Sequence, residues 1–169
     1  MDTARRDDLR KLAELIKDIR VAMLSTPRVD ADGMRTRPMY TQRLDADSFD
    51  GELWFMTDAD SEKAREIGPD APVVLTYADA SKNRYVVVEG RARIERDSAR
   101  TRELWNLHAK GWWPGGPDDP AVRLIHVRID RAEYWDGPSN LAYMVRLARA
   151  TVTGDRARVE GEHDEMRVR

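Results

Sequence analysis

The chain has 169 residues, which favours one domain large enough to bury a hydrophobic core. Charged residues make up 36% of the sequence with both signs interspersed, and the formal net charge is -2. A nucleic-acid-binding protein would more often show a basic patch, so that class is disfavoured. No cysteine is present, which excludes disulfides, thiolate nucleophiles and cysteine-bound zinc or iron–sulfur clusters.

The N-terminal residues 1–8 carry mixed charge and are not followed by an apolar segment, so we expect no secretory signal. No apolar run approaches the ~20 residues that a membrane-spanning helix needs. We therefore expect a cytoplasmic protein whose partners are neither a membrane nor a nucleic acid.

The first third of the chain predicts one helix and a hairpin. Apolar residues recur at three- and four-residue steps over residues 9–19, which is typical of an amphipathic helix. Two strand-like stretches, 20–26 and 34–44, flank a turn that ends in Asp-Gly at residues 32–33. Pro38 falls inside the second strand and predicts an edge position or a bulge there.

The remaining elements are predicted from apolar runs and from the turn and cap residues between them. A glycine inside a strand pattern often marks a bulge, so Gly90 predicts one in the strand expected over 85–94. We predict strands over 53–57, 73–77, 85–94 and 121–135, helices over 62–67, from 97 or 98 to about 109 and from 139 onward, and irregular structure over 111–117.

About six strands in consecutive order predict a mainly β, α+β fold with an antiparallel sheet. Closing the sheet into a small barrel would remove its exposed edges, and an open α+β sandwich is the alternative. We divide the chain into a domain over residues 1–153 and a charged tail over 154–169. The tail is poor in apolar residues, and we expect it to be loose.

A candidate anion site lies where the strand ending at Thr57 meets the following short helix. Ser61 stands at the start of that helix and Lys63 in its first turn, where free N–H groups and a positive charge attract phosphate. Arg35 and Arg37 lie two apart on one strand and so share a face. A solvated helix start is the alternative interpretation.

Tryptophans supply a second candidate feature. Trp112 and Trp113 lie in a Gly- and Pro-rich segment, where such side chains often stack on a flat ligand or anchor an interface. Capping of the core is the alternative. The three histidines lack metal-ligand spacing, and we expect His126 to be a hydrogen-bonded structural residue. With no metal site and no acid–base pair predicted, a cofactor would carry the chemistry.

Several short motifs follow one another in an order typical of a known family. They are Arg37-Pro38-Met39, Leu53-Trp54-Phe55-Met56-Thr57 with Ser61 and Lys63, and Tyr85-Val86-Val87-Val88-Glu89-Gly90. Together they resemble the pyridoxamine 5′-phosphate oxidase-related, FMN-binding split-barrel superfamily. Later motifs resemble its general stress protein 26 branch: Leu104-Trp105-Asn106, Lys110-Gly111-Trp112-Trp113-Pro114-Gly115-Gly116, Asp119-Pro120 and Ala132-Glu133-Tyr134-Trp135-Asp136.

The resemblance implies an antiparallel, six-stranded, Greek-key split β-barrel with peripheral helices. It also implies a homodimer with FMN at the subunit interface. Phosphate would be held by Arg37, Ser61 and Lys63, and the tryptophans would reach the partner's flavin. The implied cofactor-binding residues are Arg37, Pro38, Met39, Phe55, Met56, Thr57, Ser61, Lys63, Trp112, Trp113 and Trp135.

Two departures from the family pattern narrow the expected function. The C-terminus lacks the Arg-x-His motif of pyridoxamine phosphate oxidases, so vitamin B6 oxidation is not expected. Glu62 stands where many such oxidases have an arginine, which removes one phosphate partner. We expect a flavoprotein that acts on a small-molecule electron donor or acceptor, with no catalytic residue assigned. A non-enzymatic flavin carrier or sensor, a protein-interaction module without flavin, and the same barrel with FAD, deazaflavin F420 or haem remain alternatives.

Overall fold

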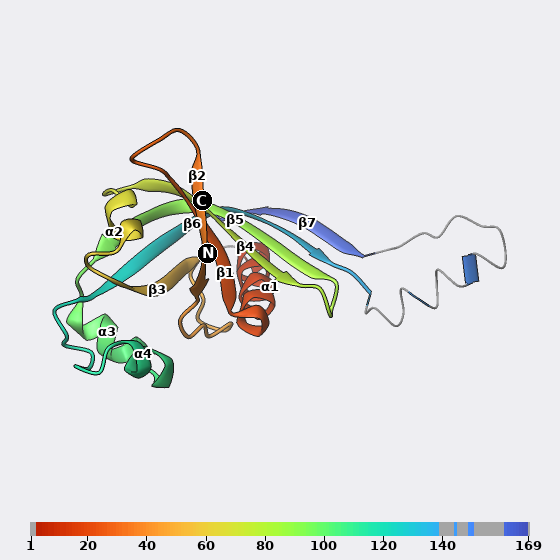
Figure 1. Ribbon diagram of the computed structural model, residues 1–169. Coiled ribbons are helices and arrows are strands. Elements are labelled where there is room, and N and C mark those ends of the chain that lie inside the picture. The colour runs from red at the N-terminus through yellow and green to blue at the C-terminus, as the bar shows by residue number, and fades with distance from the viewer. Residues whose placement is uncertain (1–2, 139–143, 145–148, 151–160, 169) are drawn as a thin grey trace.

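The fold is a curved antiparallel sheet with helices at one end and one long helix packed on it (Figure 1). The computed structural model describes residues 3–138, 144, 149–150 and 161–168. Its elements are α1 (Thr3–Ile19), β1 (Val21–Pro27), β2 (Met34–Tyr40), β3 (Glu52–Asp58), α2 (Glu62–Glu66), β4 (Ala71–Asp79), β5 (Arg84–Glu95), α3 (Ser98–Leu104), α4 (Leu107–Trp112), β6 (Val122–Asp136) and β7 (Glu162–Arg167).

The strand order is β2-β1-β4-β5-β6-β3, with β7 also paired to β6. Strand β5 occupies one edge of β6 along most of its length, so β3 and β7 share the other edge. β3 pairs with the first half of β6, up to Arg128, and β7 pairs with the second half, from Arg131. The long strand β6 therefore pairs with three strands: β5 along one edge, and β3 and β7 along the other.

Two predictions about the sheet are corrected by this topology. The sheet has seven strands rather than six, and it is not closed, since no ladder joins β2 to β3 in the described part of the chain. A hydrogen bond from the Gln42 N–H to the Trp54 carbonyl, 2.9 Å long, brings the two ends together just beyond β2. Pro38, which has no N–H, lies in edge strand β2 as predicted.

The predicted loose tail contains the seventh strand. Most of β7 is polar and exposed, and for this reason its sequence pattern predicts a loose tail. The segment is nevertheless a strand, because it pairs with the edge of β6. Met166 and Val168 point inward and are buried with the core. The predicted boundary at 153/154 lies outside the described residues, as does the predicted helix from Ser139 apart from isolated residues.

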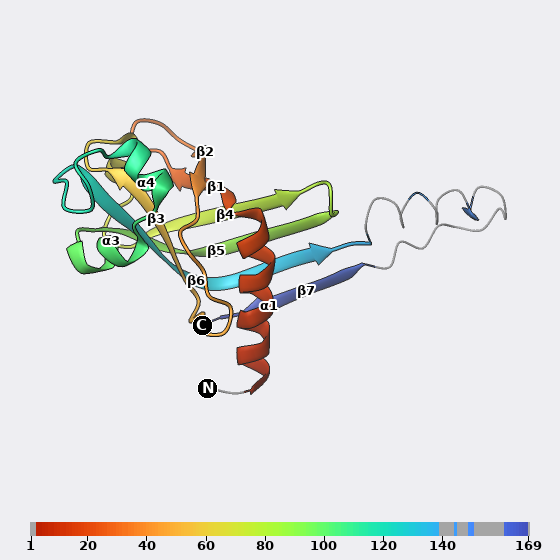
Figure 2. The same cartoon turned by 90° about the horizontal axis from the view of Figure 1, so that it is seen from below.

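Helix α1 packs on the sheet through the apolar stripe that its periodicity predicts (Figure 2). The buried side chains are Leu9, Leu12, Ala13, Leu15 and Ile16. They contact a core built from the inward-facing residues of the strands, including Leu24, Leu75 and Ile125. Burial of each such side chain contributes roughly 1.5–3 kcal/mol. This packing makes α1 a fixed wall of the molecule.

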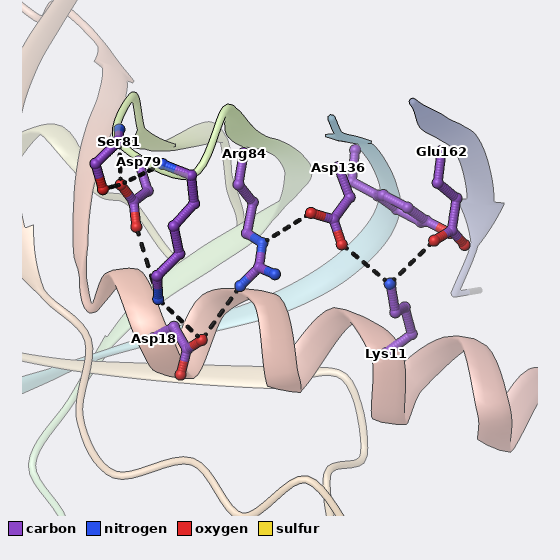
Figure 3. A network of polar contacts seen from close by, with 9 residues as sticks. Lys11, Asp18, Asp79, Ser81, Arg84, Asp136 and Glu162 are labelled. Atoms are coloured by element: carbon purple, nitrogen blue, oxygen red, sulfur yellow. Dashed lines mark hydrogen bonds and ion pairs between the residues drawn. The ribbon is translucent and has the colours of Figure 1, made fainter. Parts of the chain in front are cut away.

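A network of ion pairs joins α1 to the start of β5, the end of β6 and the start of β7 (Figure 3). Lys11 lies 3.2 Å from Asp136 on β6 and 3.1 Å from Glu162 on β7. Arg84 on β5 bridges Asp136 at 3.1 Å and Asp18 on α1 at 3.2 Å. Burial acts to raise the pKa of the Asp136 carboxyl, but hydrogen bonds from Arg84 and Lys11 outweigh it and hold that pKa below its usual value.

The helical segment after β5 differs from its prediction. One helix was expected up to about residue 109, but α3 ends at Leu104 and a second helix, α4, starts at Leu107. The Asn106 side chain accepts a hydrogen bond from the Ala109 N–H at 3.0 Å and so caps α4. Gly111 and Trp112, predicted to be irregular, form the last turn of α4.

Gly90 lies at a bulge, as predicted: the pairing of β5 with β6 shifts register between Glu89 and Gly90. A Cβ atom added at Gly90 would stand 2.2 Å from the backbone oxygen of Arg128. We expect Gly90→Ala to lower the free energy of unfolding by about 2–3 kcal/mol, because the backbone must shift to make room. Urea denaturation measures this change.

Gly68→Ala is the matched control, because an added Cβ there meets no atom within 4 Å. We expect that variant to unfold within ~0.5 kcal/mol of the parent chain. Equal stabilities of the two variants would show that the close approach at the bulge is not a constraint.

Candidate functional site

The short helices α2, α3 and α4 lie toward one end of the sheet (Figure 1). A cavity of about 190 Å³ opens beside α2 and α4. Its walls come from the ends of β2 and β3, the start of α2, and α4. The lining residues are Pro38, Met39, Tyr40, Gln42, Met56, Thr57, Asp58, Lys63, His108, Ala109, Trp112 and Trp113. Most of the residues predicted to bind a cofactor are therefore brought together in one place.

The inner wall is formed by neighbouring strand ends. Met39 on β2 and Met56 on β3 are largely buried, and Thr57 follows Met56 at the end of β3. These side chains give the cavity an apolar floor. Pro38, beside Met39, completes this wall at the exposed edge of the sheet.

Ser61 caps α2, as its sequence position predicts. Its hydroxyl accepts a hydrogen bond from the Ala64 N–H at 3.3 Å and donates one to the Asp58 carbonyl at 2.8 Å. It also lies 2.9 Å from the Thr57 hydroxyl. The Ser61 hydroxyl is thus engaged within its own turn and is not part of the cavity lining, so its role toward phosphate stays a prediction.

Arg37 points away from the lining and into a buried ion pair with Glu66. Its guanidinium donates to the Glu66 carboxylate and to the Thr26 hydroxyl, and Thr26 in turn donates to Glu66 at 2.7 Å. Arg35 approaches the second oxygen of Glu66 at 3.2 Å. The Glu66 side chain is only 2% exposed, so this carboxylate compensates two cations inside the protein.

No sequence pattern singles out Glu66, because a five-residue helix is too short to reveal a buried face by periodicity. Burial acts to raise the pKa of the Glu66 carboxyl. The hydrogen bonds from Thr26 and Arg37 and the charge of Arg35 outweigh burial and hold the pKa below its usual value. Glu66 is therefore a stable anion at the pH of the cell.

Lys63 is the cation that Glu66 does not neutralise. The Lys63 side chain lines the cavity and is half-buried. Within the described residues no carboxylate oxygen lies within 4.0 Å of its ammonium group. Burial lowers the pKa of Lys63 below its usual value, and the nearby Arg37 charge lowers it further. Such a cation can donate hydrogen bonds to an anionic group of a ligand.

The two loop tryptophans have different environments. The Trp113 indole N–H donates to the Asp58 carboxylate at 2.7 Å, and the ring is 8% exposed in a small core with Met56 and Leu104. Trp112 is 68% exposed at the mouth of the cavity. Both line the cavity of their own protomer, and their reach to a partner's flavin stays a prediction.

Phe55 and Trp135 lie elsewhere in the protomer. Phe55 alternates into the main core and is fully buried. Trp135 lies near the far end of β6, about 40 Å along the strand from Val122, which pairs beside the cavity at Asp58. There it stacks on His163 of β7 with ring centroids 5.0 Å apart. A role for either residue toward a cofactor stays a prediction.

Five lining residues were not predicted: Tyr40, Gln42, Asp58, His108 and Ala109. The Tyr40 and His108 rings stack, with centroids 4.6 Å apart and an interplanar angle of 23°. The Gln42 side-chain oxygen accepts a hydrogen bond of 2.8 Å from the Asn106 amide, which links the end of β2 to α4. His108 stands on the exposed side of a short helix and carries no pattern that sequence alone could use.

His126, expected to be structural, is buried and hydrogen-bonded. Its Nδ1 lies 3.0 Å from a Glu95 oxygen, its Nε2 lies 3.0 Å from a Glu52 oxygen, and its ring stacks on Trp54. Across the described residues, no group of His, Asp or Glu side chains is arranged to hold a metal ion. No helix in that same part of the chain has the length and apolar character to cross a membrane.

Comparison with known proteins gives consistent matches over most of the chain. The sequence profile of the family described as pyridoxamine 5′-phosphate oxidase like matches residues 7–158. Protein bli-3 of Neurospora crassa is 28% identical over 117 residues, which are 64% of this chain and 56% of that protein. The chain thus spans little more than half the length of this curated relative.

Solved structures match more completely. A protein of Jannaschia sp. CCS1 assigned to general stress protein 26 superimposes with a TM-score of 0.77 at 22% identity, over 96% of this chain and 99% of that one. General stress protein 26 of Bacillus anthracis is 30% identical with a TM-score of 0.58, over 73% and 92%. A general stress FMN/FAD binding protein of Xanthomonas citri is 25% identical with a TM-score of 0.67, over 77% and 89%.

The buried ion pair predicts an acid-sensitive stability. We expect Glu66→Gln to lower the free energy of unfolding by about 3 kcal/mol at pH 7, because Arg37 then lacks its buried counter-charge and Arg35 keeps only the exposed carboxylates of Glu62 and Asp30. Since the folded-state pKa of Glu66 lies below its unfolded value, the pair stabilises the protein above about pH 4. That contribution is lost as the pH falls through the folded pKa, and the variant should lack this part of the pH dependence.

Denaturation in urea from pH 7 to pH 3 measures both effects. Glu62→Gln is the control, since it removes an exposed partner of the same Arg35 and should cost at most ~1 kcal/mol. The assignment fails if the two substitutions destabilise the protein equally.

Proposed function

The chain belongs to the pyridoxamine 5′-phosphate oxidase like family, in its general stress protein 26 branch, and we propose that it binds FMN in the cavity between β2, β3 and α4. The observation that carries this proposal is Lys63, a half-buried cation at the cavity wall with Arg37 nearby and no carboxylate partner in the described chain. A phosphate group supplies the missing negative charge.

The rest of the lining suits a flat, largely apolar ring system. Met39 and Met56 would lie beneath the ring, and methionine sulfur makes favourable contacts with aromatic faces. Trp112 at the mouth would cover it. Trp113 holds the wall in place through its bond to Asp58. The Xanthomonas citri relative is described as FMN/FAD binding, which supports a flavin and leaves FAD as an alternative.

The cavity also suggests that a second copy of the chain completes the site. Its volume of about 190 Å³ is below the ~300–1,000 Å³ typical of small-molecule sites. Exposed apolar side chains lie directly beside it on β1: Val21 is 46% and Met23 42% exposed. Val21 pairs with Tyr40 and Met23 with Pro38, so these residues share the outer face of the cavity wall. We propose that this face packs against a partner protomer.

When bound, the flavin would supply redox chemistry with a small-molecule electron donor or acceptor. The chain's own residues would hold and orient it: Lys63 the phosphate, and Met39, Met56 and Trp112 the ring. The hydrogen bond between Trp113 and Asp58 would keep α4 closed against β3 and limit the access of water to the inner wall.

Substitution of Lys63 tests the phosphate assignment. We expect Lys63→Gln to weaken FMN binding by about 1.5–3 kcal/mol, because a charge-assisted hydrogen bond is lost. Riboflavin, which lacks the phosphate, should bind both proteins alike. Titration of the apoprotein, followed by flavin absorbance and fluorescence, measures both affinities.

Arg65→Gln is the matched control, because it removes the same charge from the same helix while Arg65 points to solvent and donates to the Asp60 carbonyl. We expect that variant to retain full affinity for FMN. If Lys63→Gln binds FMN as tightly as the parent chain, the phosphate does not lie at Lys63.

The dimer proposal has its own test. We expect Met23→Glu to shift the protein from dimer to monomer, because an unpaired carboxylate would be buried in the interface. Analytical ultracentrifugation measures the change, and Val29→Glu, which alters an exposed apolar residue in the β1–β2 loop, is the control. A parent chain that sediments as a monomer, or two variants that remain fully dimeric, would contradict this interface.

A further inference from the structure

A second and larger cavity, of about 790 Å³, adjoins the first. It lies between the C-terminal end of α1, the segment that follows β2, and the start of α4. Tyr40, Gln42 and His108 line both cavities and so form the wall between them. A ligand in the larger cavity would therefore be separated from a ligand in the smaller cavity only by these side chains.

The larger cavity carries an excess of positive charge. Lys17, Arg20 and Arg43 line it, against a single carboxylate, Asp45. In the part of the chain that the structure describes, none of the three has a carboxylate oxygen within 4.0 Å; Arg20 donates instead to the Tyr40 hydroxyl at 3.0 Å.

This excess is local rather than a general property of the surface. The net charge of the chain is -2, and several arginines on the sheet are engaged by carboxylates. Arg84 contacts Asp18 and Asp136, and Arg131 contacts Glu89 and Glu165. Three cations that have no acidic partner within 4.0 Å in the described chain thus line one cavity of a net-negative protein.

The backbone at Arg20 is held in an unusual conformation that serves this arrangement. Arg20 has φ 63°, in the left-handed region that non-glycine residues rarely adopt. Its N–H donates to the Ile16 carbonyl at 2.9 Å, and its carbonyl accepts from the Thr41 N–H at 2.8 Å. Such a conformation costs on the order of 1 kcal/mol and is typically retained where a site needs it. Here it turns the chain sharply between α1 and β1 beside Tyr40.

A flat wall completes the cavity. The stacked rings of Tyr40 and His108 provide an aromatic surface, and Ile16, Leu44 and Leu107 add apolar lining. We propose that the larger cavity binds a flat, anionic small molecule, an aromatic carboxylate, with its ring toward the Tyr40–His108 wall and its carboxylate among the three cations. That this molecule lies beside a flavin, as substrate or electron carrier, rests on the proposed function; the anion site itself does not.

The proposal is tested by comparing the binding of 2-naphthoate with that of 2-naphthamide, its uncharged analogue. Isothermal titration, with and without saturating FMN, should show naphthoate binding at least about tenfold more tightly than the amide, a ratio that corresponds to one charge-assisted hydrogen bond. Arg43→Gln should reduce naphthoate affinity by about three- to tenfold and leave amide affinity unchanged, and Lys17→Gln serves as the second variant.

Arg6→Gln is the matched control, because it removes the same charge from an exposed position on α1 that lies far from the cavity. Equal affinities for naphthoate and naphthamide would overturn the proposal. So would equal losses of naphthoate affinity in Arg43→Gln and Arg6→Gln. Each variant is first compared with the parent chain by thermal unfolding.

The titration separates this proposal from the flavin assignment. A protein that binds FMN but does not discriminate naphthoate from naphthamide retains its proposed function and loses the anion site. A protein that fails to bind FMN, yet selects naphthoate through Arg43, keeps the anion site and loses the flavin.

Discussion

The shared edge of β6 is the constraint on which the rest of the fold depends. β3 and β7 must follow one another along that edge, and the change occurs at the bulge opposite Gly90, where Asp130 is left out of register. The Ile129 N–H still bonds to the Gly51 carbonyl, and the Asp130 carbonyl accepts from Val168. A bulge bends its strand. The first half of β6 can therefore curl with β3 toward β2, and this curl forms the smaller cavity, while the second half continues beside β7.

Glu66 decides the electrostatics of that cavity. Three cations, Arg35, Arg37 and Lys63, lie near the junction of β2 and α2, and the buried carboxylate engages only the two arginines. Without Glu66 the three positive charges would repel one another in a poorly solvated place. With it, the arginines become part of the framework and Lys63 alone faces the cavity. The same arrangement limits Arg37 as a direct ligand, although its charge still acts on the site.

Sequence patterns predicted the elements whose signals are local, and missed those that depend on distant partners. The stripe of α1, the Asp-Gly turn, the Ser61 cap and the Gly90 bulge were all predicted, because each depends on a few neighbouring residues. β7 was missed because it forms by pairing with the edge of β6 and has little apolar content of its own that a sequence pattern could reveal. The family resemblance identified most of the residues that line the smaller cavity. Glu66 and His108 were not identified, because their roles are defined only by tertiary contacts.

The distribution of charge links the two cavities into one functional region. Salt bridges on the sheet and α1, such as those of Arg84 and Arg131, leave little net field there, because paired exposed charges largely cancel. Lys63 lines the smaller cavity and three further cations line the larger one, and in the described chain none of these four has a carboxylate oxygen within 4.0 Å. Oriented charges of one sign around a cleft raise the local concentration of oppositely charged molecules. On the two proposals made above, this arrangement would favour anions at both cavities, and the stacked rings of Tyr40 and His108 would separate the two ligands while keeping them adjacent.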